Sequence, residues 1–289
     1  MTPTLVRQHP SRTGPALRVD QRARARDWSE IQERMLVPLY EAVHERLGVG
    51  PGTRLLALGC GTGLALLLAA ARGAAVTGTD TRPEHLALAR ERLLPAAPDA
   101  PGAAGTRACP DAASPARTTP RLVDGPPGAR DHRAPYTLVT AFEPLGCPAG
   151  DPPEPAAPLA AAVPLAGRGT PVVLAGWGPP ERCAAADVLR VATRPADPLP
   201  VVRDRLEDVA RDAGLRPDGS GRVACPFGYA DLDSAVRGML STGWFDTAIA
   251  TAGHDQVGKE LTEALHAHRR RDGTVWMPNV FRYLIARTP

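Results

Sequence analysis

The sequence predicts an α/β fold built on a doubly wound, mostly parallel sheet of seven strands. Short apolar runs alternate with helix-forming segments over most of the chain. Such alternation is typical of parallel strands joined by right-handed crossovers. A glycine-rich turn joins the first strand to a helix, because residues 54–63 read Arg-Leu-Leu-Ala-Leu-Gly-Cys-Gly-Thr-Gly. Both observations place a ligand site at the carboxyl ends of the strands, where open α/β sheets bind their ligands.

The elements follow from the pattern in chain order. Asp27 or Ser29 is the expected cap of a first helix that runs to about Leu47. Further helices are expected at 62–72, 83–94, within 151–165, at about 199–213, and as two or three helices in 231–270. Clear strands are expected at 54–58, 75–79, 136–141, 171–175, 274–277 and 279–286, of which the last two would close the sheet edge in antiparallel fashion.

The third strand has two candidate positions in a stretch, residues 95–135, that is dense in Pro, Ala and Gly. A strand at 106–109 would place Asp111 at its tip, and a strand at 121–123 would place Asp124 there. The pattern leaves both open. Either choice leaves a polar surface insertion in this variable segment.

The turn carries three glycines at alternate positions, Gly59, Gly61 and Gly63. Glycine adopts backbone angles that other residues resist and has no Cβ to block a ligand. The second strand ends on Asp80, about 20 residues further on, where a carboxylate can accept hydrogen bonds from ribose hydroxyls. The third glycine stands one residue too early for a dinucleotide fingerprint, which needs G-x-G-x-x-G.

The G-x-G-x-G spacing resembles motif I of the class I S-adenosylmethionine (SAM) dependent methyltransferases, in their small-molecule branch. The resemblance extends over most of residues 26–289 and is weakest at about 95–135. It implies a Rossmann-like fold, SAM as the cofactor, and a helical lid at about 226–272 inserted before the last strand. One departure lies in motif I itself: the family usually carries an acid where this chain has Ala57. A second lies at Tyr136-Thr137, where the fourth strand of the family commonly begins Phe-Asp.

The resemblance also implies which residues meet the cofactor. They are Gly59, Cys60, Gly61, Gly63, Asp80, Thr81, Ala141 and Phe142, with Asp111 or Asp124 facing the adenine amino group. Cys60 is interpreted as a small filler in the turn rather than a nucleophile.

The substrate pocket is expected to use aromatic side chains near the strand tips and the inserted helices, because aromatics make up only 4% of the chain. The candidates are Trp28, Tyr40, Trp177, Tyr229 and Trp244. Glu143, just past the fourth strand, is the expected base or substrate-orienting acid, with His132 and His254 as weaker candidates.

Composition indicates one domain, residues 26–289, after a flexible arm of residues 1–25. A net charge of +3 is too small to indicate a nucleic-acid surface. The five cysteines lie far apart without a C-x-x-C pair, so neither a disulfide framework nor a metal site is expected. The longest apolar runs predict no membrane span and no signal peptide. We therefore expect a cytoplasmic protein. Its oligomeric state is left open, with a homodimer or a complex with a partner subunit as the alternatives.

The function that best fits these observations is SAM-dependent methyl transfer to a small molecule, in specialised natural-product metabolism. The acceptor atom is left open between O, N and C. Ala57 and the poor pattern at 95–135 favour one alternative, a methyltransferase-like enzyme repurposed for cyclisation, elimination or rearrangement. A third alternative is a non-catalytic subunit that stabilises a partner enzyme.

Overall fold

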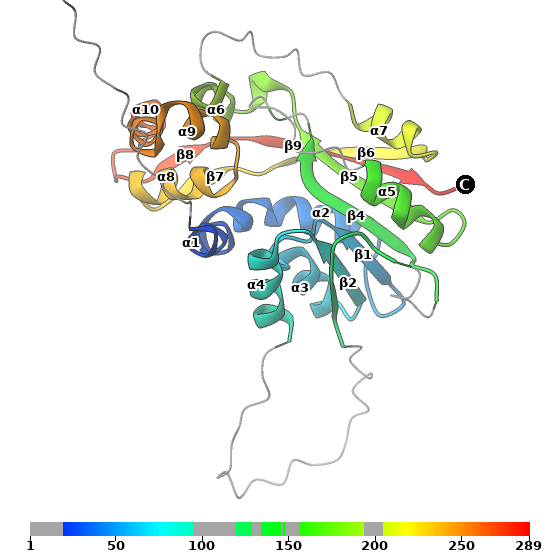
Figure 1. The fold of residues 1–289 in the computed structure, drawn as a ribbon. Helices are drawn as coiled ribbons and strands as arrows, with labels where there is room; N and C mark the ends of the chain where they lie inside the picture. The colour runs from blue at the N-terminus through cyan, green and yellow to red at the C-terminus, as the bar shows by residue number, and fades with distance from the viewer. Residues whose placement is uncertain (1–19, 95–118, 129–133, 146, 148–155, 194–204) are drawn as a thin grey trace, which may run out of the picture.

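A seven-stranded sheet runs through the computed structural model, which describes residues 20–94, 119–128, 134–145, 147, 156–193 and 205–289. Its strand order is β3-β2-β1-β4-β5-β9-β6 (Figure 1). Neighbouring strands pair in parallel from β3 to β5, and β9 is antiparallel to both of its neighbours. The strands are β1 (Arg54–Leu58), β2 (Ala75–Asp80), β3 (Arg121–Asp124), β4 (Leu138–Leu145), β5 (Pro171–Trp177), β6 (Arg216–Ala224) and β9 (Val280–Arg287). The predicted doubly wound, mostly parallel sheet is confirmed.

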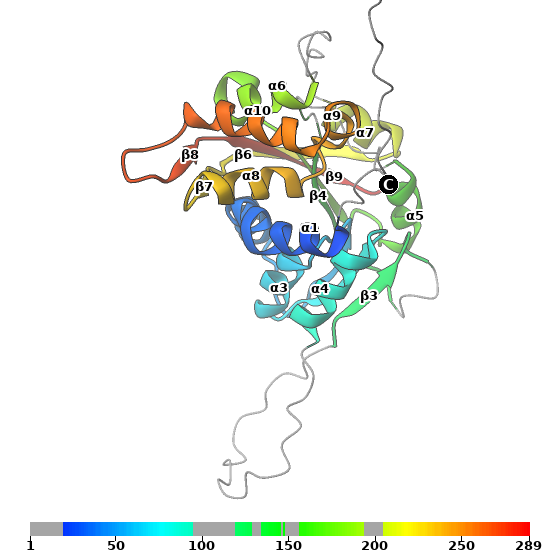
Figure 2. The same cartoon turned by 60° about the vertical axis from the view of Figure 1, so that its left-hand side comes forward.

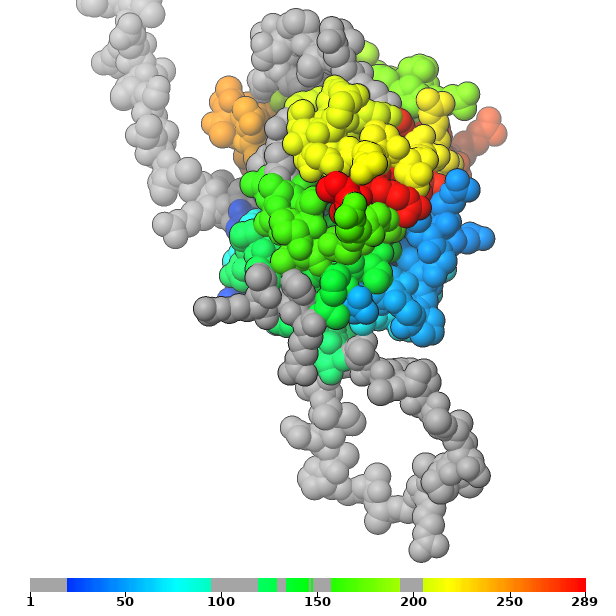
Figure 3. All heavy atoms as spheres, turned by 90° about the vertical axis from the view of Figure 1, so that its right-hand side faces the viewer, coloured from blue at the N-terminus to red at the C-terminus, as the bar shows by residue number. Residues whose placement is uncertain are grey.

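Helices cover both faces of this sheet. One face carries α2 (Val37–Arg46), α3 (Leu64–Ala71) and α4 (Pro83–Leu93). The other carries α5 (Ala156–Ala162), which η4 (Val163–Leu165) continues, and α7 (Leu206–Asp212). In Figure 3 the C-terminal strand β9 passes between α7 and α5 on this second face. The side chains of β1 alternate accordingly: Leu55 and Ala57 belong to the core under α2 and α3, whereas Leu56 and Leu58 belong to the core under α5 and α7.

The N-terminal helical segment begins earlier than predicted. Asp20, rather than Asp27 or Ser29, is the cap, and its side chain accepts hydrogen bonds from the backbone of Arg22 and Ala23. The path continues through α1 (Gln21–Asp27), a π-helical turn η1 (Trp28–Gln32), a 3₁₀ turn η2 (Glu33–Leu36) and α2. Single π-helical turns inside helices are frequent at functional sites. Here the turn begins at Trp28, one of the predicted substrate residues.

The register of the parallel strands aligns their carboxyl ends at one edge of the sheet. Leu58 of β1 pairs with Thr79 of β2 and with Ala141 of β4. Asp80 pairs with Asp124, the last residue of β3. The third strand is therefore the second of the two predicted candidates, with Asp124 at its tip, whereas Asp111 lies outside the described residues.

The C-terminal part differs from the prediction in two strands. The segment expected as a closing strand of the main sheet, β8 (Val275–Met277), pairs instead with β7 (Phe227–Tyr229) in a separate two-stranded sheet. The seventh strand of the main sheet is β6, which was not predicted, and it displaces β9 from the sheet edge. The sequence of β6 is polar on both sides, and six of its nine residues are exposed, so it carries no apolar alternation that would mark a strand.

Four helices gather beyond the carboxyl edge of the sheet. They are α6 (Ala185–Thr193), which was not predicted, and α8 (Leu232–Ser241), α9 (Asp246–Ala252) and α10 (His254–His266). The two views agree that α1 lies between α8 above and α4 below (Figures 1 and 2). The N-terminal segment thus joins the inserted helices to the half of the sheet that carries the glycine turn. Among the described residues, no helix is both long and apolar enough to cross a membrane.

We expect Gly78→Ala to destabilise the protein by about 1–3 kcal/mol, because it overpacks the joint between β2 and the glycine turn. A Cβ at Gly78 would lie 2.5 Å from Leu66 Cδ1 and 2.8 Å from Cys60 Sγ. Gly219→Ala, also in a strand, is the matched control, because no heavy atom lies within 4 Å of its Cβ position. Urea unfolding measures both. Equal stability of the two variants would contradict the packing argument.

Candidate functional site

The turn between β1 and α3 adopts a conformation that requires glycine at three positions. The φ angles of Gly59, Gly61 and Gly63 are 60°, 56° and 82°, in the left-handed region that residues with a Cβ rarely adopt. A Cβ at Gly63 would lie 3.2 Å from both Ala89 Cβ and Leu93 Cδ1. Gly63 therefore allows α3 and α4 to pack closely, whereas Gly59 and Gly61 leave the backbone of the turn accessible from the cavity above it.

Asp80 is buried at the end of β2, and its carboxylate is fully hydrogen-bonded. Oδ1 accepts from Arg82 N at 2.9 Å and from Arg82 Nε at 3.1 Å. Oδ2 accepts from Gly61 N at 2.8 Å and from Arg82 Nη2 at 3.1 Å. Burial by itself would raise the pKa of Asp80, but the hydrogen bonds and positive charge of Arg82 outweigh it and lower the pKa below its ordinary value. Asp80 thus fixes the glycine turn and holds an arginine.

Glu33 of the N-terminal segment reaches the same turn from the other side. Its side chain is 3% exposed, and Oε2 accepts hydrogen bonds from Thr62 Oγ1 and from Arg92 Nη1. Oε1 accepts a longer bond, 3.4 Å, from the backbone N–H of Leu64 in the first turn of α3. Arg92 also donates to the carbonyl of Thr62 and to Ser29 Oγ. Two carboxylates from distant segments therefore hold the turn, one on each side.

A cavity of about 60 Å³ lies over this turn. Two buried polar atoms in its wall have no hydrogen-bond partner among the described residues: Trp28 Nε1 and Thr140 Oγ1. Trp28 Nε1 lies 3.6 Å from the Cβ position of Gly61. A buried donor or acceptor without a partner costs about 1–3 kcal/mol, which a polar ligand at this place would recover.

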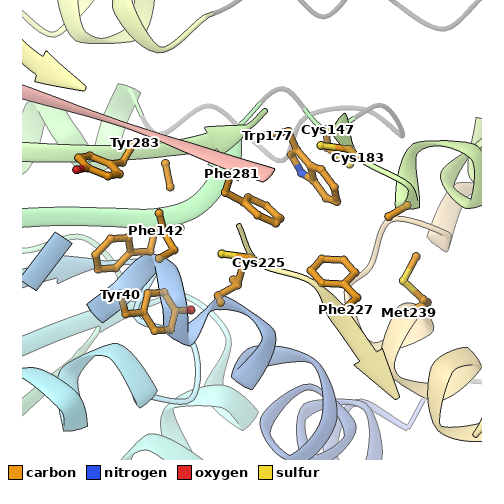
Figure 4. Close-up of a cluster of buried hydrophobic side chains, with 14 of the residues drawn as sticks. Tyr40, Phe142, Cys147, Trp177, Cys183, Cys225, Phe227, Met239, Phe281 and Tyr283 are labelled. Carbon is orange, nitrogen blue, oxygen red and sulfur yellow. The ribbon is translucent and has the colours of Figure 1, made fainter. Parts of the chain in front are cut away.

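Five of the predicted site residues line the cavity with the glycine turn. They are Trp28, Tyr40, Phe142, Glu143 and Trp244. The rings of Tyr40 and Phe142 lie 4.9 Å apart, side by side in Figure 4. The carboxylate of Glu143 lies over the first glycine, with Oε2 3.5 Å from the Cβ position of Gly59, and it is about half exposed.

Two predicted substrate residues are not part of the cavity wall. Trp177, at the end of β5, lies behind Trp244, with ring centroids 5.4 Å apart, and packs with Phe227 and Phe281 in a buried aromatic cluster (Figure 4). Tyr229 is buried and donates its hydroxyl hydrogen bond to Gln32 Oε1 at 2.8 Å. Both side chains support the wall from behind.

The remaining predicted residues lie around the turn or away from it. Cys60 lines the cavity, and burial, with the charge of Asp80, raises the pKa of its thiol to about 12, so it is no nucleophile. Thr81 and Asp124 are exposed at the strand ends, and Ala141 is buried within β4. His254 begins α10 beside a surface groove and does not line the cavity. His132 and Asp111 lie outside the described residues.

The sequence did not identify four residues that shape the site: Glu33, Arg82, Arg92 and Thr140. Only Arg82 carried a signal, since it lies two residues after Asp80 in the same turn. Glu33 is 31 residues from its partner Leu64, and Arg92 is 59 residues from Glu33. Such contacts depend on tertiary packing and leave no local pattern.

Comparison with known proteins supports the predicted resemblance. Residues 56–101, which contain the glycine turn, β2 and α4, match the family model described as a methyltransferase domain. This match agrees with the likeness to the class I SAM-dependent methyltransferases, and it supports S-adenosylmethionine as the cofactor. No curated protein matches the sequence.

Solved structures resemble this chain at low sequence identity. A Bacillus halodurans C-125 protein provisionally assigned as a methyltransferase is 14% identical, with a TM-score of 0.51, over 86% of this chain and 98% of its own. A SAM-dependent methyltransferase of Aquifex aeolicus is 12% identical, with a TM-score of 0.48, over 93% and 98% of the two chains. Geranyl diphosphate C-methyltransferase of Streptomyces coelicolor A3(2) is 14% identical, with a TM-score of 0.45, over 87% and 75%. The likeness to the Bacillus halodurans protein, at 14% identity, concerns the fold alone.

The residues around the turn fit the cofactor in kind. An open glycine turn and two polar atoms without partners line one cavity, and the carboxylate at the end of β2 lies next to it behind Arg82. The space does not fit without rearrangement, because drug-sized ligands occupy about 300–1,000 Å³ and this cavity is about 60 Å³. The side chain of Arg82 lines the cavity and covers Asp80. It is one of the groups that would have to move to make room for the cofactor.

We expect Glu33→Ala to destabilise the protein by roughly 3 kcal/mol, because it leaves the partly buried Arg92 without its carboxylate. Glu30→Ala, on the exposed side of the same segment, is the control and is expected to change stability by at most about 0.5 kcal/mol. Chemical unfolding of both variants tests this. A Glu33→Ala variant as stable as the control would mean that the turn does not depend on this ion pair.

We expect His85 to make the protein less stable below pH 6.5. Burial, with the charge of Arg82, lowers the pKa of His85 from 6.5 to about 4, and its ring stacks on Trp28. The folded state therefore keeps His85 neutral while the unfolded chain protonates it. The resulting stability is complete above pH 6.5 and is lost as the pH falls towards 4, by about 1.4 kcal/mol per pH unit.

The measurement is the free energy of unfolding at pH 7 and pH 5. His85→Gln should reduce the difference between the two pH values by about 2 kcal/mol relative to wild type. His266→Gln, at the exposed end of α10, should leave the difference unchanged. If His85→Gln and wild type lose the same free energy, His85 is not held neutral in the fold.

Proposed function

We propose that this chain transfers a methyl group from S-adenosylmethionine to a small, partly apolar acceptor held under the inserted helices. The observation that carries the proposal is the joint position of Asp80 and the glycine turn. The carboxylate hydrogen-bonds Gly61 directly and lies at the carboxyl edge of the sheet, beside the tip of β3. Nucleotide-type ligands in open α/β sheets bind at this edge.

Named residues would hold the cofactor. Asp80 would accept hydrogen bonds from the ribose hydroxyls, and Asp124, its neighbour in the register, would face the adenine amino group. The backbone at Gly59 and Gly61 is open to the cavity. Trp28 Nε1 and Thr140 Oγ1 lack partners there, and either would gain one from a polar group of a ligand. The cofactor, when bound, supplies an electrophilic methyl group on a positively charged sulfur.

The aromatic wall supports an acceptor pocket with little water. Four aromatic side chains line the cavity: Trp28 and Tyr40 from the N-terminal segment, Phe142 from β4, and Trp244 from the segment between α8 and α9. Burial, with the charge of Glu33 second, raises the pKa of Tyr40 well above its ordinary value, so its hydroxyl keeps its proton. Methyl transfer needs alignment more than covalent help, and these rings would provide the alignment.

Glu143 is the carboxylate best placed to act on the acceptor. It lies in the cavity wall at the end of β4, half exposed, with Arg82 Nη1 3.8 Å from its Oε1. A carboxylate there can accept a proton from an O–H or N–H acceptor or orient it through a hydrogen bond.

A second candidate function is a reaction other than methylation on the same scaffold, with the cofactor site retained or lost. Two observations favour it. Ala57 contributes no charge to the cavity floor, where the family usually has an acid. The carboxylate of Asp80 is occupied by the chain's own arginine. A role as a stabilising partner subunit would instead need an uncovered apolar face.

We expect calorimetry to detect micromolar binding of both SAM and S-adenosylhomocysteine by the wild-type protein. Asp80→Ala should weaken binding of both about tenfold to a hundredfold, the value of hydrogen bonds to a charged group, and should abolish methyl transfer. Glu91→Ala, an exposed acid on α4, controls for the loss of one negative charge.

The outcomes separate the candidate functions. Binding of both ligands, lost in Asp80→Ala only, supports the cofactor placement. Turnover of an acceptor without S-adenosylhomocysteine release would favour the repurposed enzyme. No binding up to about millimolar ligand, by a folded sample, would exclude methyl transfer by this chain alone.

A further inference from the structure

The carboxylate of Asp80 has no acceptor position left for a ligand. A carboxylate offers about four lone-pair positions. Arg82 occupies three of them, through its backbone N, Nε and Nη2, and Gly61 N occupies the fourth. The side chain of Asp80 is 3% exposed, and that of Arg82 is 41% exposed and forms part of the cavity wall. The ribose-binding group of the proposed site is thus covered by a side chain that can move.

The guanidinium presents to Asp80 the same pattern that a ribose would. Nε and Nη2 are two parallel donors, one for each carboxylate oxygen. A vicinal diol also carries two donors on adjacent atoms. The backbone donors, Arg82 N and Gly61 N, use the other two positions and need not move. Binding of a ribose would therefore replace the two bonds from Arg82 Nε and Nη2 to Asp80 by two bonds from the ribose hydroxyls.

We propose that Arg82 is an internal competitor for the vicinal diol of the cofactor: it closes the site when the site is empty and must leave Asp80 before a nucleoside can bind. The inference rests on the proposed function, because it takes a nucleoside as the ligand. The apparent affinity for a nucleoside is then the affinity of the open site multiplied by the fraction of molecules in which Arg82 has left Asp80.

Glu143 is the group that receives Arg82 when it leaves. Its Oε1 lies 3.8 Å from Arg82 Nη1, and its side chain is half exposed, so a small rotation brings the two into hydrogen-bond contact. The charge of Glu143 also contributes to a raised pKa of Arg82 in the closed state. The guanidinium therefore keeps a carboxylate partner in both positions, which reduces the cost of opening.

The first test is the affinity for S-adenosylhomocysteine of the full chain carrying Arg82→Ala, measured by calorimetry. We expect binding about tenfold to a hundredfold tighter than in wild type, the value of hydrogen bonds to a charged group. Arg90→Ala removes an equal charge from an exposed position on α4 and should bind as wild type does. Should Arg82→Ala not fold, Arg82→Gln, which keeps a single neutral donor, is expected to give a smaller gain.

The second test distinguishes competition for Asp80 from a general gain in space. Adenosine is uncharged, so the loss of a positive charge does not by itself attract it. Arg82→Ala should tighten adenosine binding more than it tightens 2′-deoxyadenosine binding, because the deoxy compound lacks one of the two hydroxyl donors. An equal gain for both nucleosides would overturn the proposal.

The third test uses Glu143→Gln. In the wild-type background it should weaken adenosine binding, because Arg82 loses its alternative partner and stays on Asp80. In the Arg82→Ala background the same change should have no effect on adenosine. A residue that touches the ligand directly would lower affinity in both backgrounds, so equal losses would overturn the assigned role of Glu143.

Failure of this inference can be told from failure of the proposed function. If wild type binds S-adenosylhomocysteine and Arg82→Ala binds equally or less tightly, Arg82 is not a competitor, and the cofactor site stands. If neither wild type nor any variant binds S-adenosylhomocysteine or adenosine, the nucleoside site itself is wrong, and the inference is overturned with it. If Arg82→Ala binds these ligands and wild type does not, the result supports both the nucleoside site and the role of Arg82 as a competitor.

Discussion

The site depends on the hydrogen bond between Gly61 N and the carboxylate of Asp80. The turn from β1 to α3 contains three residues with positive φ. A backbone hydrogen bond within it joins Gly63 N to the carbonyl of Cys60 at 3.0 Å, and further bonds come from distant segments. Asp80 fixes it from β2, and Glu33 fixes it from the N-terminal segment through Thr62 and Leu64. Glu33 lines the cavity, and Asp80 lies behind Arg82, which also lines it, so the groups that stabilise the turn lie close to where a ligand would bind.

The position of β9 connects this turn to the inserted helices. As the antiparallel strand between β5 and β6, it brings Phe281 opposite Trp177 in the register. Trp177 then supports Trp244 in the cavity wall, and the cluster reaches Phe227 in the small sheet (Figure 4). A cover made of inserted helices would be mobile if it rested on loops alone. Here it rests on β9, which is paired on both sides by β5 and β6, so the cavity wall has a rigid base.

Local patterns predicted the local part of the molecule. The strand, glycine turn and helix around Gly59 follow from neighbouring residues, and so does the place of Asp80. Strand β6 was missed because its polar sequence, Arg216 to Ala224, has no apolar side to bury, and its strand form comes from pairing with β9. The pairing of β8 with β7 could not be predicted either, because the three apolar residues of β8, Val275–Met277, would fit the main sheet or the small one. Glu33, Arg92 and Thr140 required the tertiary structure, because their roles rest on contacts between distant segments.

Arginine suits position 82 for a reason of geometry rather than charge alone. A lysine would place one compact ammonium near Asp80, whereas the planar guanidinium engages both carboxylate oxygens and still directs Nη1 towards Glu143. The carboxylates of Asp80 on β2 and Glu143 on β4, the two strands that flank β1, thus share one guanidinium group. When the guanidinium of Arg82 moves to Glu143, it keeps a carboxylate partner. The buried Asp80 keeps its two backbone donors, Gly61 N and Arg82 N. A saturated carboxylate in a binding site is therefore compatible with binding, provided that the group which saturates it has a second acceptor within reach.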